Sequence, residues 1–223
     1  MKIQIIPIFD DNYAYLLQSL SGVNAVIDPG QAEPIINALE KQNIKLDYIL
    51  NTHHHWDHVD GNKELIDKYG AKIIQNTTPI FKFGSEKVQI IKTPGHTMDS
   101  VCFYFKNSHA VFTGDTVFSM GCGRVFEGTA NDMFGSFQKI MALPDDTMIY
   151  PAHEYTRGNA GFCLSQDRDN QHLKKRIEEV KALRDEGKPT LPVLLETEKK
   201  TNIFMKAKNA SEFTALRIKK DNF

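Results

Sequence analysis

The sequence predicts an α/β sandwich that carries a small helical part at its C-terminal end. Short β-like runs alternate with helical patterns up to about residue 155, and beyond it only helical spacing is visible. Histidines and aspartates recur where several of the β-like runs end. With 223 residues, 41% of them hydrophobic, the chain is long and apolar enough to bury a proper core.

The expected elements follow one another along the chain in short steps. Apolar or β-branched runs predict strands over residues 3–8, 13–18, 23–27, 48–51, 72–75, 88–91, 101–105, 110–113 and 148–150. Apolar residues at three- and four-residue spacing predict helices over residues 33–42, 63–69 and 133–141. Strand meanders with interspersed helices are typical of layered α/β folds.

After Tyr155 the chain changes character. Residues 169–187 are highly charged, and their apolar residues recur at helical spacing: Leu173, Ile177, Val180 and Leu183. Gly187-Lys188-Pro189 ends that helix, and residues 210–219 form the last one. We therefore predict a main domain over residues 1–162 and a small helical domain over residues 163–223 that packs on it.

Charge, cysteines and the N-terminus exclude several classes of protein. The formal net charge of -1 gives no sign of a nucleic-acid-binding surface. Cys102, Cys122 and Cys163 are odd in number and form no Cys-x-x-Cys pair, which favours a reducing compartment. The apolar run 3–9 stops at Asp10-Asp11, too soon for an export signal or a membrane span, so we expect a cytoplasmic protein without a membrane partner.

The most informative segment is His53-x-His55-x-Asp57-His58, which follows a predicted buried strand. Imidazole nitrogen and carboxylate oxygen are common ligands of open, catalytic zinc sites. On an extended backbone His53, His55 and Asp57 would share one side and His54 would face the other. A turn into the next helix would then bring His58 beside the first three.

Three more candidate ligands stand at strand-to-loop transitions. They are His96 in Thr93-Pro94-Gly95-His96, Asp115 in Thr113-Gly114-Asp115, and His153 in Pro151-Ala152-His153. Loops at strand ends are where a rigid scaffold usually presents catalytic groups. Seven ligands then suffice for two metal ions, whereas His109 and His172 are expected to be ordinary surface or core histidines.

This order of ligands resembles the metallo-β-lactamase superfamily. Within it, the chain is similar to the hydroxyacylglutathione hydrolases, the glyoxalase II family, and the resemblance extends over nearly the whole length. The closer likeness lies in four segments: 52–58, 121–124, 126–130 and 153–156. The resemblance implies an αββα metallo-β-lactamase sandwich with the metals at one edge between the sheets, followed by a helical domain that binds glutathione.

The resemblance also implies a ligand set for two divalent metal ions. His53, His55 and His96 would hold one metal, Asp57, His58 and His153 the other, and Asp115 would bridge them. Zinc is the first expectation, and iron and manganese are alternatives because the same donors accept them. A metal-bridging hydroxide would attack a thioester carbonyl, Asp57 would orient or deprotonate the metal-bound water, and the thiolate would leave unaided because a thiol pKa is ~8.5.

The implied substrate is an S-(2-hydroxyacyl)glutathione, notably S-D-lactoylglutathione, cleaved to glutathione and D-lactate in methylglyoxal detoxification. By resemblance Arg124, Tyr155, Arg217 and Lys220 would bind the glutathione part, whose carboxylates suit cationic partners. Phe126 stands where a tyrosine is usual, so one substrate hydrogen bond is in question. Asp60 stands where glycine is common. A monomer acting on this small molecule is expected.

Three alternatives share some of these features. A glutathione persulfide dioxygenase on the same fold would use a single iron and oxygen. A lactonase or β-lactamase would keep the metals but have no use for Arg124, Arg217 and Lys220. A non-catalytic zinc module is disfavoured because structural zinc sites are closed and rich in thiolates. Asp28 is the one candidate for a group that fixes the orientation of a ligating imidazole.

Overall fold

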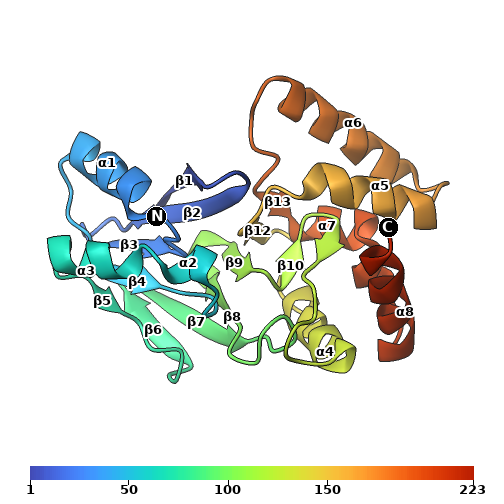
Figure 1. Cartoon of the computed structure of the whole chain (residues 1–223), viewed down its shortest axis with the longest axis horizontal. Coiled ribbons are helices and arrows are strands. Elements are labelled where there is room, and N and C mark those ends of the chain that lie inside the picture. Colours follow the sequence, from blue (N-terminus) through green and yellow to red (C-terminus); the bar gives the residue numbers. More distant parts are fainter.

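Two β-sheets form the middle of the molecule (Figure 1). The computed structural model describes residues 1–223. One sheet has the order β1 (Lys2–Ile8), β2 (Asn12–Gln18), β3 (Asn24–Ile27), β4 (Tyr48–Leu50), β5 (Lys72–Ile73). The other has the order β13 (Val193–Leu194), β12 (Met148–Pro151), β9 (Ala110–Gly114), β8 (Val101–Phe105), β7 (Glu86–Lys92), β6 (Ile80–Phe83). A two-stranded ribbon, β10 (Val117–Phe118) with β11 (Gly121–Cys122), extends from the second sheet.

The two sheets and the helices on their outer faces form four layers in the order αββα. Between the sheets, residues of β2 and β3 such as Tyr15 and Ile27 pack against residues of β8 and β9 such as Phe103 and Phe112. The outer face of the first sheet is covered by α1 (Ala32–Gln42) and α3 (Asn62–Tyr69), and that of the second by α4 (Ala130–Met141). The sandwich predicted from the sequence is confirmed.

Strand direction brings distant parts of the chain to one edge. β7 and β9 are both antiparallel to β8, and β12 is parallel to β9, so β7, β9 and β12 all end on the same side. In the first sheet, β3 and β4 are also parallel and end together. The loops after these strands are the ones that carry the predicted ligands, and the short helix α2 (Trp56–Val59) follows β4 among them.

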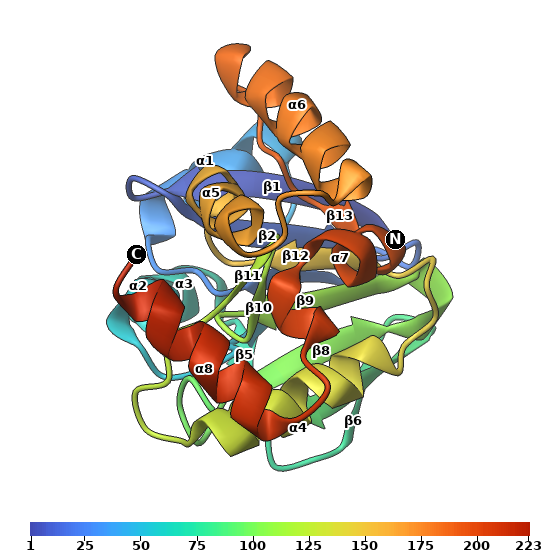
Figure 2. The same ribbon diagram turned by 90° about the vertical axis from the view of Figure 1, so that its right-hand side faces the viewer.

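The C-terminal part is built from helices that share a core with the sandwich. They are α5 (Thr156–Gln166), α6 (Gln171–Asp185), α7 (Leu195–Thr201) and α8 (Ala210–Asp221), with a short 3-10 turn at Ile203–Lys206. In Figure 2, α8 lies across α4, and the ring centroids of Phe213 and Phe137 are 5.0 Å apart. The boundary proposed between residues 162 and 163 falls inside α5.

Most predicted elements are present, and the elements that were missed are short except for α5. The predicted strands and helices overlap observed ones, but β6, β10, β11, β13, α2, α5 and α7 were not predicted. The expectation of no strand after residue 155 is wrong, because Val193 and Leu194 pair with β12. A two-residue strand exists only through its partner and has no pattern of its own. No helix has both the length and the apolar character to cross a membrane.

Candidate active site

The ligand-rich segment leaves β4 and turns sharply into a helix. The chain is extended at His55, with φ -60° and ψ 145°, and α2 begins at Trp56. Asp57 and His58 are therefore presented by a helical turn, so the expectation of an extended backbone through Asp57 is wrong. The turn packs closely on Gly30, where a Cβ atom would lie 1.9 Å from the Asp57 carbonyl oxygen, so this approach requires glycine.

All seven predicted ligand side chains meet in one place. His96 lies in the loop after β7, Asp115 directly follows β9, and His153 follows β12. Together with the 53–58 segment they form three overlapping groups of potential ligand atoms: His53, His55 and His96; His53, His58 and Asp115; and Asp57, His58 and His153. Asp115 lies between the groups, with Oδ2 3.5 Å from His96 Nε2 and Oδ1 3.4 Å from His153 Nε2.

The polar atoms of this cluster fit metal ions. His55 Nδ1 lies 3.0 Å from both His53 Nε2 and His96 Nε2, so three imidazole nitrogens point to a common region. His58 Nε2 and Asp115 Oδ1 are buried without a hydrogen-bond partner. Buried polar atoms without partners are rare in folded proteins, and cations that bind them all would satisfy this set.

The electrostatics of the cluster point the same way. Burial, followed by the neighbouring His58, lowers the pKa of His53 to about 2, so this imidazole is neutral. Burial alone would raise the pKa of Asp115, but His153 and His58 outweigh it and hold that pKa below its ordinary value. Burial also opposes protonation of His58, yet the Asp115 and Asp28 carboxylates raise its pKa. The buried carboxylates therefore favour positive charge in their midst.

Polar side chains around the cluster contact the predicted ligands and orient them. The Thr52 hydroxyl donates to Asp28 Oδ2 at 2.7 Å and lies 3.1 Å from His53 Nδ1. Asp28 Oδ2 also lies 3.1 Å from His58 Nδ1, as suspected from the sequence. Such partners orient ligating imidazoles.

Three of these supporting contacts were missed by sequence reasoning. His153 Nδ1 pairs with Asp11 Oδ1 at 2.9 Å, His96 Nδ1 lies 2.8 Å from the Arg124 carbonyl oxygen, and Asn12 Nδ2 donates to Asp57 Oδ2 at 2.9 Å. Asp11 ends the turn between β1 and β2, Asn12 is the first residue of β2, and a polar turn at a sheet edge was the only available signal.

His54 lies outside the cluster, as the alternation of side chains indicated. Its Nδ1 is 2.9 Å from Asp99 Oδ1 and its Nε2 is 3.3 Å from Glu127 Oε1. All three side chains are exposed. Exposed pairs of this kind contribute little to stability. His109 and His172 are exposed and belong to none of the groups of potential ligand atoms, as expected. Asp60 is exposed at the end of α2.

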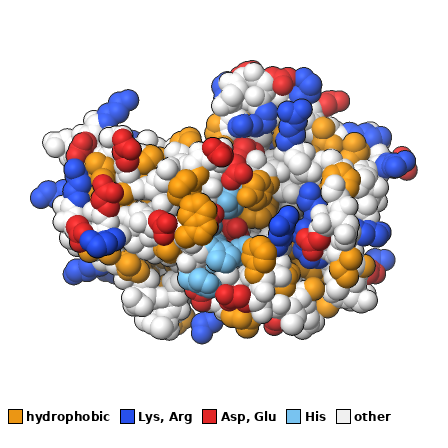
Figure 3. Space-filling view, viewed as in Figure 1, with side chains coloured by type: hydrophobic (Ala, Val, Ile, Leu, Met, Phe, Trp, Pro, Cys, Tyr) orange, Lys and Arg blue, Asp and Glu red, His pale blue; other side chains and the backbone are white.

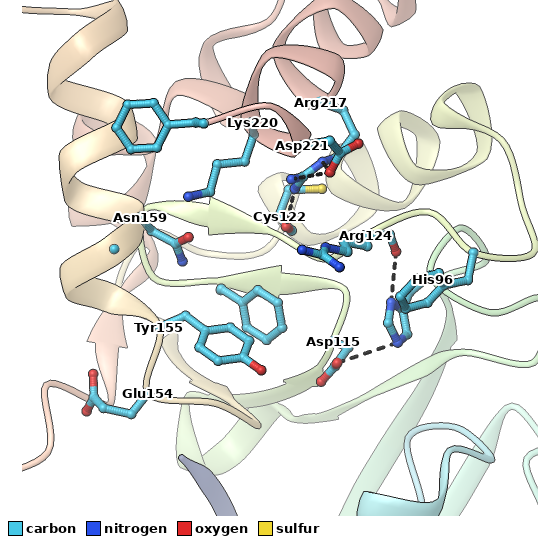
Figure 4. Close-up of a pocket in the computed structure, with 14 residues that line it drawn as sticks. His96, Asp115, Cys122, Arg124, Glu154, Tyr155, Asn159, Arg217, Lys220 and Asp221 are labelled. Atoms are coloured by element: carbon cyan, nitrogen blue, oxygen red, sulfur yellow. Dashed lines mark hydrogen bonds and ion pairs between the residues drawn. The ribbon is translucent and has the colours of Figure 1, made fainter. Parts of the chain in front are cut away.

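A cavity of about 680 Å³ opens from the ligand cluster toward the C-terminal helices. Figure 3 shows histidines in the middle of one face, with hydrophobic side chains beside them and Lys and Arg side chains to one side. His96 and Asp115 line the cavity at one end (Figure 4). The four predicted substrate-binding residues all line it as well: Arg124, Tyr155, Arg217 and Lys220.

These four residues differ in how freely they face the cavity. The Tyr155 ring stacks on His153, with centroids 4.6 Å apart and planes 8° apart. The Lys220 ammonium lies over the rings of Phe162 and Phe223, and burial lowers its pKa. Arg217 is buried and already hydrogen-bonded, whereas Arg124 is exposed. Phe126, 61% exposed, lies 5.2 Å from the His96 ring and covers the ligand cluster on one side.

Residues of the C-terminal part hold the turn between β10 and β11 through hydrogen bonds. Glu198 of α7 is fully buried and accepts hydrogen bonds from Ser119 Oγ at 2.8 Å and from the Met120 amide at 2.7 Å. Asn202 donates to the carbonyl oxygens of Phe118 and Gly121. Met120 has φ 52°, a strained value that these contacts stabilise. This support for the loop leading to Arg124 was not visible in the sequence.

Sandwich, edge position and ligand set together define a metallo-β-lactamase superfamily protein. The profile of that superfamily matches residues 8–78 and 74–153, and a profile described as hydroxyacylglutathione hydrolase C-terminus matches residues 154–223. A hydroxyacylglutathione hydrolase of Pelagibacter ubique is 45% identical over 239 aligned positions, covering 100% of both chains. One of Rhizobium meliloti is 40% identical, covering 96% of this chain and 95% of its own. The chain belongs to the hydroxyacylglutathione hydrolase family.

Solved structures confirm the fold. ETHE1 from Myxococcus xanthus superposes with a TM-score of 0.73 at 22% identity, over 98% of this chain and 90% of that one. A metallo-beta-lactamase from Staphylococcus aureus gives a TM-score of 0.72 at 21% identity, over 97% of this chain and 66% of that one. At this identity the likeness shows the fold alone.

Proposed function

We propose that this protein hydrolyses S-(2-hydroxyacyl)glutathione thioesters, S-D-lactoylglutathione in particular, with two divalent metal ions. One observation carries the proposal: a single cavity joins the ligand cluster, at His96 and Asp115, to the cationic side chains of Arg124, Arg217 and Lys220. A thioester carbonyl at one end and the carboxylates of glutathione at the other would use both ends of the cavity. The names and full-length coverage of the relatives support the same substrate.

In this proposal His53, His55, His96 and Asp115 hold the first metal, and Asp57, His58, His153 and Asp115 hold the second. The metals supply an activated water and polarise the thioester carbonyl. The donors are imidazoles and carboxylates without thiolate, which fits zinc first and iron or manganese as alternatives.

The remaining chemistry belongs to side chains of the protein. His58 and Asn12 outweigh the effect of burial and hold the pKa of Asp57 below its ordinary value, so Asp57 stays a carboxylate. A weak base of this kind suits orienting a water molecule better than deprotonating it. The departing glutathione thiolate needs no general acid, since the pKa of a thiol is ~8.5.

Glutathione itself would lie along the C-terminal side of the cavity. Arg124 and Lys220 would attract its carboxylates, Arg217 would complete the cationic surface, and Tyr155 would contact the peptide next to the ligand cluster. We assign catalysis to residues 1–162 and glutathione binding to residues 163–223, with Arg124 and Tyr155 of the first part also contacting glutathione. A monomer in the cytoplasm completes the proposal, and the unpaired, buried Cys102, Cys122 and Cys163 fit a reducing compartment.

The test is a thioester assay on purified protein whose metal content is measured in the same sample. We expect about two metal ions per chain and rapid hydrolysis of S-D-lactoylglutathione. The thioester of N-acetylcysteamine with the same lactoyl group lacks both carboxylates and should react with a much higher KM. A metal-replete sample inert toward glutathione thioesters would contradict the proposal. Oxygen consumption with glutathione persulfide would favour the dioxygenase instead.

A further inference from the structure

Arg217 is held from two sides by the protein. Its Nη1 donates to the Cys122 carbonyl oxygen at 2.6 Å, and its guanidinium lies 5.4 Å from the centre of the Phe204 ring. Only 7% of the side chain is exposed. The first contact joins α8 to β11 and the second joins α8 to the 3-10 turn at Ile203–Lys206, and together they fix where the guanidinium lies at the wall of the cavity.

The remaining edge of Arg217 is covered by the carboxylate of Asp221. Both Nε, at 3.1 Å, and Nη2, at 2.8 Å, donate to Asp221 Oδ1. This pair of donors is one of the edges with which arginine binds a carboxylate through two parallel hydrogen bonds. An incoming carboxylate that sought this edge would meet another carboxylate already there.

Asp221 is placed so that it can give way. Its side chain is 46% exposed, it stands in the last turn of α8, and it lines the cavity beside Arg217 and Lys220 (Figure 4). Of the other acidic residues that line the cavity, Asp115 belongs to the ligand cluster, and Glu154 accepts hydrogen bonds from Thr190 and Tyr13 and is almost fully buried. Asp221 is therefore the half-exposed negative charge beside the cations Arg217 and Lys220.

We propose that Asp221 is a tethered competitor for the substrate carboxylate. It occupies Arg217 while the cavity is free, and it yields that edge when a glutathione-type anion binds. This lowers the affinity of the cavity for such anions and speeds the release of glutathione. The inference rests on the proposed function, because it takes the ligand to be a glutathione derivative.

A purely supporting role for Asp221 makes the opposite prediction. If the carboxylate served only to orient Arg217, removing it would weaken binding of the anion. As a competitor, its removal tightens binding. Asp221→Asn keeps an acceptor for Arg217 and removes the charge, and Asp221→Ala removes both. The direction of the change in affinity therefore separates the two roles.

The experiment is calorimetric titration of the full-length, metal-replete protein with S-methylglutathione, a thioether that cannot be hydrolysed. We expect both Asp221 variants to bind it about three- to fivefold more tightly than the wild type, as suits the loss of a half-exposed ion pair. The gain should shrink as salt is raised, since the effect is electrostatic. In steady-state assays, inhibition by product glutathione should strengthen by a similar factor.

Asp185→Asn is the matched control. Asp185 pairs with Lys181 at 2.5 Å with the same four-residue spacing, on the surface of α6 and away from the cavity. Its substitution should leave the affinity unchanged. If the wild type binds S-methylglutathione and the Asp221 variants bind it equally or more weakly, the competitor role is wrong while the proposed function stands. If neither wild type nor variants bind it, both fail.

Discussion

The ligand cluster and the cationic end of the cavity are built on different principles. The seven predicted ligands follow strands of both sheets and lie close together, with His58 Nε2 and Asp115 Oδ1 left without hydrogen-bond partners. At the cationic end of the cavity, Arg217 is hydrogen-bonded to Asp221, and the Lys220 ammonium lies over two aromatic rings. The polar atoms of the first region call for bound cations, whereas in the second region Arg217 and Lys220 already have partners within the protein.

This difference predicts how changes in the two regions act. Loss of a ligand or of its support should lower kcat, because the reacting groups depend on their positions. Changes at the cationic end should act mainly on KM, because they alter binding that is shared by the substrate and the transition state.

The largest effect is expected for His58→Ala. It removes a buried ligand at the centre of two of the three ligand groups. We expect kcat/KM to fall by about 10³-fold or more, equivalent to roughly 4 kcal/mol, and the metal content to fall below two per chain. The control is His172→Ala, at an exposed position of α6. Near-normal activity with full metal content in His58→Ala would refute the assignment.

Gly123→Ala should be almost as severe. A Cβ atom there would lie 1.8 Å from the Asp115 carbonyl oxygen, so the chain carrying this ligand must move. Overpacking of this kind costs about 1–3 kcal/mol of stability, and the shifted Asp115 should reduce activity further. Gly135→Ala in α4 is the matched control, since nothing lies within 4 Å of its Cβ position. Thermal unfolding and kinetics on both variants would measure this contrast.

Asp11→Asn tests the support of the ligands. Asp11 Oδ1 accepts from His153 Nδ1 at 2.9 Å, and such partners are worth about 10–100-fold in metal affinity or activity. Metal titration with a competing chelator would show the loss. Asp10→Asn alters the exposed neighbouring carboxylate and should change neither the metal affinity nor the activity. An equal effect of the two substitutions would mean that general charge, not the contact with His153, is responsible.

Lys220→Ala should raise KM for S-D-lactoylglutathione about tenfold with kcat nearly unchanged. Arg217→Ala should raise KM too, but it should also lower the free energy of unfolding, because the buried guanidinium joins α8 to Cys122 and Phe204. Lys219→Ala, next to Lys220 and exposed, serves as the control. A fall in kcat alone for Lys220→Ala would place this lysine in the chemistry instead of in binding.

The smallest effect is expected for Thr129→Ala, at the start of α4. Thr129 and Asp132 form a reciprocal capping box, and loss of such a cap costs about 1 kcal/mol. Hydrogen bonds from Thr129 lower the pKa of Asp132, so this stabilisation is present above the ordinary pKa of aspartate and is lost as the pH falls through the lowered value. In denaturant unfolding, the difference in the free energy of unfolding between wild type and Thr129→Ala should therefore become smaller at acid pH. Kinetics should not change.

Much of the sandwich could be predicted from the sequence, because its strands are long enough to carry their own apolar pattern. That His53, His55, Asp57 and His58 lie together could also be predicted, since they are only a few residues apart, although the backbone conformation at Asp57 could not. His96, Asp115 and His153 were found because each follows a recognisable strand. Their meeting depended on β7, β9 and β12 running in one direction.

The rest was decided only by packing. Asp57 is presented by a helical turn, β13 exists only beside β12, and Glu198 reaches Ser119 across 79 positions of the chain. Asp11 beside His153 and Asp221 against Arg217 follow from how loops and helix ends approach one another. Such contacts leave no periodic trace in the chain, because they depend on the relative placement of elements and not on the preferences of any one of them.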